Sequence, residues 1–251
     1  MTGLLSRSGV SNHFAASTWE RIVFSEFEST VSSESRPFPC IFGVTGLRKD
    51  QLRFTFPDPM TPETIAPLLG EYVATARDIG RMTSLVVFAR PGPVQNIEDY
   101  RDRFWSLLDG LESIDTAPRP AAVPREIDSD LWEFCFAGEP IFVACNTPAH
   151  VLRQSRRSTS FTVIFQPRWI FDGIMNTDAP AARRSVQQIH DRLEAFDAVP
   201  PNPNLGHYET PGTREYQQYF IGDTNETPRC PFHRLARPED TEEKQQEGKV
   251  A

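Results

Sequence analysis

The sequence predicts an α+β fold: a single domain with a mainly antiparallel sheet flanked by helices. Strand-like apolar runs occur in neighbouring pairs around short turns, which is typical of hairpins. Segments with apolar residues at helical spacing lie between these runs, without the regular strand–helix alternation of a parallel sheet. Hydrophobic residues make up 39% of the 251 positions and include 18 Phe, so the chain can bury a sizeable core.

The first 57 residues are expected to hold a flexible start, a helix and a hairpin. Residues 1–14 lack a clear pattern and are interpreted as a flexible N-terminus. A helix follows, because four apolar residues recur on one helical stripe, namely Trp19, Ile22, Val23 and Phe27. Apolar runs at 39–46 and 51–57 flank a polar turn at 47–50, which predicts two paired strands.

Two helices around a buried strand are predicted between residues 61 and 111. Thr61 and Pro62 suit the N-cap and the first position of a helix, which is expected to run towards Gly80. Residues 84–89 form an apolar run of strand length that a Pro-Gly-Pro turn ends. Asn96 is a good N-cap for the next amphipathic helix, whose apolar residues are Ile97, Tyr100, Phe104, Trp105, Leu107, Leu108 and Leu111.

The rest of the chain is expected to contribute a loop, a second hairpin, one strand and one helix. Three prolines place residues 116–130 in a loop. Residues 132–136 and 140–145 are predicted to pair around an Ala-Gly-Glu turn. Residues 161–166 are predicted to form a further strand, and 181–196 an amphipathic helix.

The charge and the cysteines exclude several classes of protein. A net charge of −8 without a basic stripe is unfavourable for binding nucleic acid. No apolar window approaches the ~18 residues of a membrane span, so no membrane association is expected. The four cysteines match neither a C-x-x-C redox site nor a paired zinc site, which favours a cytoplasmic protein. We expect one domain at 15–236, followed by a disordered acidic tail at 237–251.

The most informative motif is the segment from residue 145 to residue 157. Thr147 and Pro148 suit the N-cap and first position of a helix, which would place His150 in its first turn. The positive end of a helix dipole favours a neutral imidazole, which is the form that binds metal ions. Arg153 and Arg157 would share its face and suit an anionic cofactor, so a haem satisfies both features. The alternative is an ordinary helix start with arginines on its surface.

Four stretches resemble the YqcI/YcgG family and span most of the chain from about residue 19 to 234. They are 36–43 with 52–56; 132–146 continuing into Thr147-Pro-Ala-His150; 161–168; and 218–225 with the Arg-Cys-Pro-Phe-His sequence at 229–233. Characterised family members include the arginine N-hydroxylase of D-cycloserine biosynthesis and the guanidine N-hydroxylase of guanitoxin biosynthesis. The resemblance therefore implies haem b, an imidazole iron ligand and a guanidino or amino substrate.

His150 is the preferred iron ligand, since among the histidines it alone combines a strand-to-helix junction, an apolar approach and downstream arginines. His190 lies among polar residues of its helix, a pattern typical of a solvated face. The others lie in the flexible start, a Pro/Asn-rich loop and the Cys-x-x-His segment, namely His13, His207 and His233. Cys40 and Cys230 are rival ligands, because a thiolate favours O–O cleavage in other haem proteins.

The resemblance also sets demands on other side chains. The two haem propionates would pair with four arginines, namely Arg153, Arg156, Arg157 and Arg168. Phe-rich strands would line the haem, with simple core packing as the alternative, and these residues are Phe42, Phe54, Phe56, Phe134, Phe136, Phe142 and Phe165. A guanidinium substrate would need an acid such as Glu133, Glu139 or Asp172, each of which is otherwise an exposed acid. Thr147 departs from plainer family members, which carry a His before this proline.

These features together predict a haem-dependent N-oxygenase, with conversion of L-arginine to Nω-hydroxy-L-arginine as the leading reaction. The chain has no G-x-G-x-x-G fingerprint for a flavin or nicotinamide, so O₂ chemistry would need an external electron donor. The alternatives are a haem sensor or carrier without turnover, and a haem enzyme acting on an already oxidised nitrogen. The oligomeric state is left open by the sequence.

Overall fold

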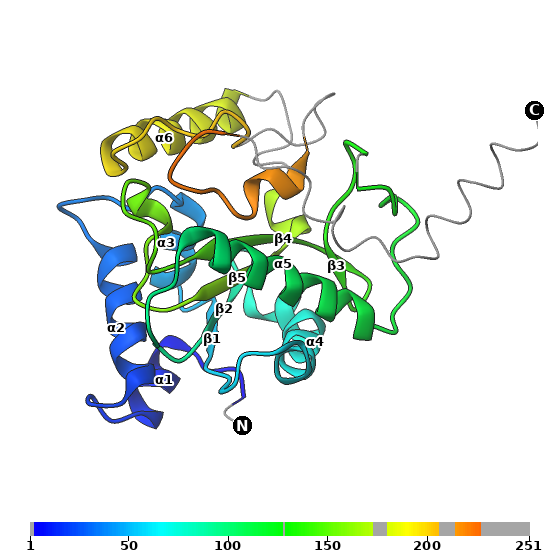
Figure 1. Cartoon of the computed structure of the whole chain (residues 1–251), viewed down its shortest axis with the longest axis horizontal. Coiled ribbons are helices and arrows are strands. Elements are labelled where there is room, and N and C mark those ends of the chain that lie inside the picture. The colour runs from blue at the N-terminus through cyan, green and yellow to red at the C-terminus, as the bar shows by residue number, and fades with distance from the viewer. Residues whose placement is uncertain (1–2, 128, 173–179, 206–213, 227–251) are drawn as a thin grey trace, which may run out of the picture.

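The computed structural model describes residues 3–127, 129–172, 180–205 and 214–226. Its centre is a sheet of five strands in the order β1-β2-β5-β4-β3, and only the β1–β2 pairing is parallel (Figure 1). The strands are β1 Leu52–Thr55, β2 Ser84–Phe88, β3 Cys135–Phe136, β4 Glu139–Asn146 and β5 Thr162–Pro167. A mainly antiparallel sheet with flanking helices confirms the predicted α+β class.

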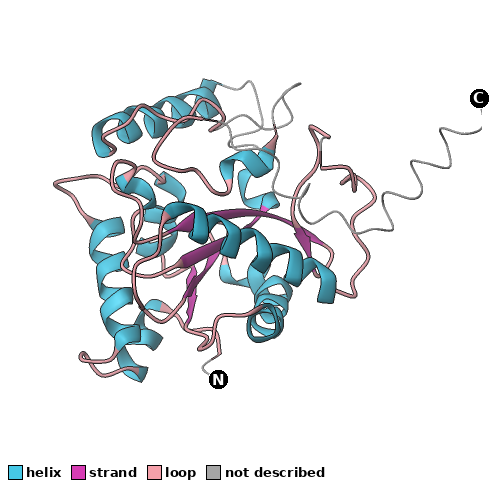
Figure 2. Ribbon diagram, viewed as in Figure 1, coloured by secondary structure: helices cyan, strands magenta, loops and turns pink. Residues whose placement is uncertain are grey.

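Six α-helices and three short 3-10 helices surround this sheet in the described residues (Figure 2). The α-helices are α1 Arg7–His13, α2 Trp19–Ser32, α3 Ile41–Arg48, α4 Pro62–Ile79, α5 Ile97–Ile114 and α6 Pro180–Phe196. The 3-10 helices are η1 Gln154–Arg156, η2 Arg168–Phe171 and η3 Glu215–Gln218. No helix in the described ranges is long and apolar enough to cross a membrane.

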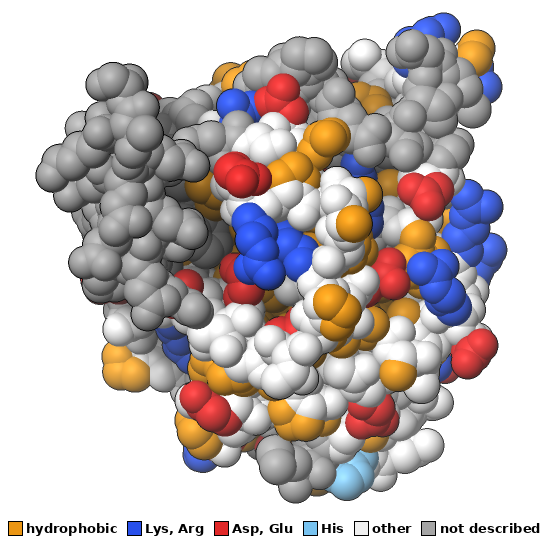
Figure 3. Space-filling model, turned by 90° about the vertical axis from the view of Figure 1, so that its right-hand side faces the viewer, with side chains coloured by type: hydrophobic (Ala, Val, Ile, Leu, Met, Phe, Trp, Pro, Cys, Tyr) orange, Lys and Arg blue, Asp and Glu red, His pale blue; other side chains and the backbone are white. Residues whose placement is uncertain are grey.

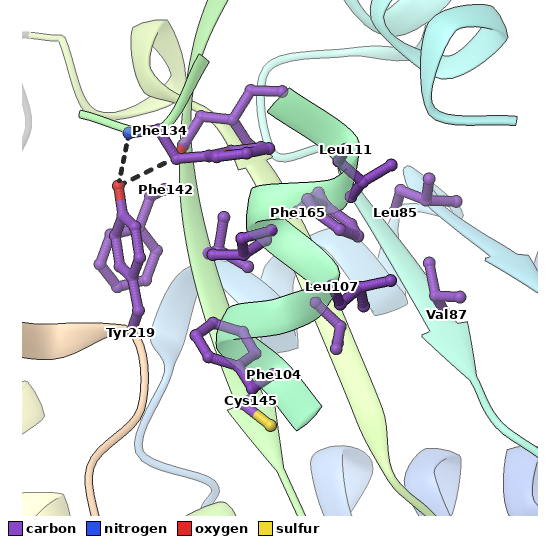
Figure 4. Close-up of a cluster of buried hydrophobic side chains, with 14 of the residues drawn as sticks. Leu85, Val87, Phe104, Leu107, Leu111, Phe134, Phe142, Cys145, Phe165 and Tyr219 are labelled. Carbon is purple, nitrogen blue, oxygen red and sulfur yellow. Dashed lines mark hydrogen bonds between the residues drawn. The ribbon is translucent and has the colours of Figure 1, made fainter. Parts of the chain in front are cut away.

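Alternation along the strands divides the core between the two faces of the sheet. In β2, Leu85 and Val87 join a cluster with α4 and α5, whereas Val86 and Phe88 join a cluster with α1 and α2. Figure 4 shows the first cluster, in which side chains of α5 pack onto β2, β4 and β5. The second face is covered less completely, and a cavity remains there between the sheet, α3 and α6.

The predicted first hairpin is wrong. Residues 41–48 form helix α3, and β1 pairs in parallel with β2 through the crossover helix α4. A short apolar run fits a buried helix as well as a strand, so its periodicity does not discriminate between them. Cys40 is the N-cap, with its Sγ accepting a hydrogen bond from the Gly43 amide at 3.3 Å. Gly46 lets α3 approach closely, because a Cβ there would lie 2.3 Å from the Met82 carbonyl oxygen.

The expectation of a flexible start at 1–14 is also wrong for most of that segment. Leu5 pairs with Phe54 of β1 through two backbone hydrogen bonds of 2.9 Å. Ser6 then caps α1, because its hydroxyl accepts a hydrogen bond from the Gly9 amide. A helix of seven residues carries too little periodicity to be recognised in the sequence, and it is stabilised by this contact with the sheet edge.

The predicted helices that correspond to α2, α4, α5 and α6, and the strands that correspond to β1, β2, β4 and β5, are confirmed with small shifts at their ends. The strand predicted at 132–136 is reduced to the two residues of β3. Ala137 and Gly138 have φ angles of 51° and 74°, so the second hairpin has the two left-handed turn residues that match strand twist. Thr61 begins α4 with a capping box, and Asn96 caps α5 by accepting the Asp99 amide. The predicted acidic tail at 237–251 lies outside the described residues.

The Tyr219→Phe substitution is expected to lower the free energy of unfolding by roughly 1–3 kcal/mol. The Tyr219 hydroxyl accepts a hydrogen bond from the Phe134 amide at 3.1 Å (Figure 4). It donates one to Glu215 Oε1 at 2.7 Å. Its loss leaves the buried Phe134 N–H unpaired. Urea unfolding would measure the change. Tyr100→Phe is the matched control, because this buried tyrosine has no hydroxyl hydrogen bond within the described residues; equal losses would refute the assignment.

Candidate functional site

The strongest candidate site is the cavity on the second face of the sheet, with a volume of about 170 Å³. Alternate residues of β2, β4 and β5 form its floor, and α2, α3 and α6 form its walls. Its aromatic lining is Phe27, Phe38, Phe42, Phe142 and Phe171. Its polar lining is Cys40, Ser84, Asn146, Arg153, Ser155, Arg156, Gln166, His190 and Gln218. No carboxylate lines it among the described residues.

The structure brings only part of the predicted haem slot to this cavity. Of the seven Phe residues predicted to line it, Phe42 and Phe142 do so. Phe134, Phe136 and Phe165 belong to the first core cluster, and strand alternation accounts for Phe165, because it pairs with Val143, which faces the other side of the sheet from Phe142. Phe54 and Phe56 lie on the same side of the sheet as the cavity, but they pack against the N-terminal helices.

His150 is fully buried, and both of its ring nitrogens are hydrogen bonded within the chain. Nε2 lies 2.9 Å from the Ile221 carbonyl oxygen, which can only accept, so Nε2 carries the proton. Nδ1 lies 2.9 Å from Thr147 Oγ1 and accepts a hydrogen bond from this hydroxyl. Burial, aided by Arg156 and Arg153, lowers the pKa of His150 to about 4. The imidazole is therefore neutral as expected, but iron ligation would require one of these hydrogen bonds to break.

The predicted helix after Thr147 is wrong. Thr147 extends the sheet region through a β-bridge to Arg157. Its hydroxyl accepts a hydrogen bond from the Ala149 amide instead of capping a helix. Only the short η1 forms further along. Local hydrogen bonding by a threonine side chain competes with a helix start, which sequence spacing alone does not reveal.

Asp223 supplies the contacts that hold this loop without a helix. Its carboxylate accepts hydrogen bonds from the amides of Val151, Leu152 and Arg153 at 2.9, 3.1 and 2.9 Å. Burial acts to raise the pKa of this carboxyl, but the amide donors together lower it below its ordinary value. The loop therefore depends on a carboxylate 70 or more residues away in sequence.

The four predicted arginines do not gather at one place. Arg153 and Arg156 line the cavity, whereas Arg157 is exposed and donates to the His150 carbonyl oxygen at 3.0 Å. Arg168 follows the opposite end of β5 and pairs with Glu133 at 2.8 Å. The predicted contacts of Glu133 and Glu139 with a substrate are likewise not formed at the cavity, and Asp172 does not line it either.

Among the described residues, Arg153 and Arg156 are the two arginines whose cationic side chains line the cavity. Arg153 is 1% exposed and donates to the Gly222 carbonyl oxygen and to Asn225 Oδ1, each at 2.7 Å. Its Nη1 has no hydrogen bond within the described residues and lies 3.7 Å from Asp197 Oδ2. Arg156 donates to the Gln218 carbonyl oxygen at 3.2 Å and has no described carboxylate within ion-pair distance. Arg156 is therefore the lining arginine that suits an anionic group most directly, because Arg153 already faces Asp197.

Two possible iron ligands line the cavity, Cys40 and His190. Burial raises the pKa of the Cys40 thiol. His190 belongs to a helical stripe with Val186, Ile189 and Leu193, at the i, i+3, i+4 and i+7 spacing of an apolar face. The sequence contained this signal, but the polar neighbours of His190 concealed it. Cys230, the other predicted rival, lies outside the described residues, as do His207 and His233.

Figure 3 shows acidic, basic and hydrophobic side chains interspersed over one face of the molecule.

The chain was compared with known proteins. The YqcI/YcgG family profile matches residues 27–233. Two proteins of Bacillus subtilis (strain 168), "Uncharacterized protein YqcI" and "Uncharacterized protein YcgG", are each 41% identical over 226 residues, covering 86% of this chain and 89% of theirs.

A third relative has a name that states an activity. It is "Putative N(omega)-hydroxy-L-arginine synthase DcsA" of Streptomyces lavendulae, 31% identical over 226 residues, which cover 85% of this chain and 84% of the relative. No solved structure gave a significant match.

Proposed function

Since the chain belongs to the YqcI/YcgG family, we propose that it is a haem-dependent N-oxygenase that hydroxylates a guanidino or amino nitrogen. The leading reaction is L-arginine to Nω-hydroxy-L-arginine, for which the printed name of DcsA is the support from comparison. The observation that carries the proposal is the cavity, which combines an aromatic lining, two arginines and two possible iron ligands.

The residues of the cavity fit the chemistry of haem. Aromatic side chains suit the porphyrin face, and buried arginines suit its two carboxylates. A cysteine thiolate and a histidine imidazole are both axial ligands of iron in haem proteins. The cavity volume of about 170 Å³ is below the ~300–1,000 Å³ of most small-molecule sites, so haem binding would require the cavity to widen.

When bound, haem would supply the reductive activation of O₂. The overall reaction consumes one substrate, one O₂, two electrons and two protons, and yields the N-hydroxylated product and one water. The electrons would come from an external donor. Arg153 and Arg156 would hold anionic groups, and the Phe residues would exclude water. Asn146 and Gln166 line the cavity, and their amide oxygens could accept hydrogen bonds from a guanidinium group where no described acid is present.

Arg156→Leu is expected to weaken haem binding by about 10- to 100-fold, which corresponds to one charge-assisted hydrogen bond of ~1.5–3 kcal/mol. A spectroscopic haem titration would measure the affinity. Arg157→Leu is the matched control, because Arg157 is exposed and does not line the cavity. We expect less than about a threefold change in haem affinity, since a charge-assisted contact with haem, worth ~1.5–3 kcal/mol, is not lost. Equal losses in the two variants would contradict a carboxylate contact of Arg156.

The test of the function has two stages. Protein produced with haem supplied is first examined for a Soret band and for a stoichiometry of one haem per chain. It is then incubated with O₂, a reductase system and a panel of guanidino and amino compounds, and products are analysed by mass spectrometry. We expect a product one oxygen atom heavier, formed only with haem and electrons.

Other outcomes separate the alternatives. Haem binding without any product would indicate a sensor or carrier. Turnover only of compounds whose nitrogen is already oxidised would indicate a different haem reaction. Absence of haem binding would refute the proposal as a whole.

A further inference from the structure

We infer that His190 of α6, and not His150, is the iron ligand of the haem-loaded protein. The inference rests on the proposed function and adds to it the residue that binds the metal. Three observations carry it: the place of His190 in the cavity, the state of its two ring nitrogens, and the hydrogen bonds that occupy His150.

His190 lies on the wall of the cavity that faces the sheet. It lines the cavity together with Val186, Ile189 and Leu193 of the same helix. These residues form one apolar face, so the imidazole projects from a hydrophobic surface that would contact a porphyrin. Arg153 and Arg156 lie elsewhere in the same lining, where they can meet the carboxylates while His190 meets the metal.

The hydrogen bonding of His190 leaves one nitrogen available. Nε2 lies 3.2 Å from the Leu205 carbonyl oxygen, which can only accept, so Nε2 carries the proton. Nδ1 is then unprotonated, and no hydrogen bond engages it within the described residues. A backbone carbonyl that fixes the tautomer of a metal-binding histidine is the usual second contact of such a ligand. Leu205 would therefore fix the orientation of the ring.

His150 lacks each of these features. It does not line the cavity, and its two nitrogens are engaged by Thr147 and Ile221. Cys40 lines the cavity, but its Sγ caps α3 by accepting a hydrogen bond from the Gly43 amide. Burial also raises the pKa of this thiol, which favours the neutral form over the thiolate that binds iron. Among the described donors, His190 alone combines access to the cavity with a free lone pair.

The experiment compares His190→Gly with three other variants, each purified with haem supplied: His150→Gln, Cys40→Ser and Gln188→Ala. Gln188 is an exposed residue of the same helix and serves as the matched control. The readouts are the absorption spectrum, haem affinity and the electron paramagnetic resonance spectrum of the ferrous nitric oxide complex. In that complex an axial imidazole nitrogen produces its own hyperfine splitting. Circular dichroism melting establishes that each variant is folded.

We expect His190→Gly to lose the imidazole splitting and to bind haem at least about 10-fold more weakly. Loss of a residue that only hydrogen bonds to a metal ligand already weakens metal binding by about 10- to 100-fold, so loss of the ligand itself should cost no less. Added imidazole should restore the spectrum, and ¹⁵N-imidazole should change the splitting pattern. The other three variants should keep the wild-type spectrum. A His190→Gly spectrum identical to wild type would overturn the inference, as would loss of the signature in His150→Gln or Cys40→Ser alone. Failure of the wild type to bind haem would instead refute the proposed function.

Discussion

Replacing Arg153 by alanine is expected to lower the free energy of unfolding by about 3–5 kcal/mol. The side chains of Arg153 and Asp197 are 1% and 0% exposed, with Nη1 and Oδ2 3.7 Å apart. Removing the cation leaves Asp197 buried, with no other cation within ion-pair distance among the described residues. It also leaves the carbonyl oxygen of Gly222 without the donor that now lies at 2.7 Å.

Urea unfolding at neutral pH, followed by circular dichroism, would measure this loss. Arg157→Ala is the matched control, since it removes an exposed arginine from the same loop and should cost no more than about 1 kcal/mol. A further variant, Arg153→Ala with Asp197→Asn, should recover part of the stability, because the second change removes the uncompensated charge. Absence of any recovery would show that Arg153 acts through packing alone.

The protein is expected to lose about 2–3 kcal/mol of stability between pH 6.5 and pH 4 because of His150 alone. The pKa of this residue is lowered to about 4 in the folded chain, against about 6.5 in an unfolded one. Between these values the unfolded state binds a proton that the folded state does not, so acid favours unfolding. The contribution is complete above pH 6.5 and decreases as the pH falls.

The free energies of unfolding of the wild type and of His150→Gln, measured from pH 4.5 to 7.5, would test this prediction. Their difference should be largest at pH 7.5 and shrink towards pH 4.5, since glutamine does not titrate. An NMR titration of the folded wild type should show the ring neutral to about pH 4. Two parallel stability curves would contradict the prediction. The loss of Thr147 and Ile221 hydrogen bonds in the variant does not depend on pH and therefore cancels from the comparison.

Elements with a complete local signal were predictable from the sequence. α4 and α5 have capping residues and long apolar stripes, and the β3–β4 hairpin has turn residues that favour left-handed backbone. Elements that depend on distant partners were not. α3 was mistaken for a strand because its apolar run is short, and α1 was missed because Leu5 is held by β1.

The candidate site followed the same division. The sequence correctly singled out His150 as a neutral imidazole, but for the wrong local reason, since burial and not a helix dipole accounts for it. The spacing of Arg153 and Arg156 in the sequence did not indicate that both side chains would line the cavity. That choice depends on Asp223, which binds three consecutive amides of the loop from far along the chain. The apolar stripe of α6 could have indicated His190.

The pairing of Leu5 with Phe54 has a practical consequence for shortening the chain. β1 is the outermost strand on its side of the sheet, and Leu5 supplies backbone partners to an edge that would otherwise be open. A version that begins at residue 15 would expose those amide and carbonyl groups together with Phe54. We therefore expect it to self-associate through strand pairing, so an expression tag is better joined ahead of the segment that contains Leu5 than substituted for it.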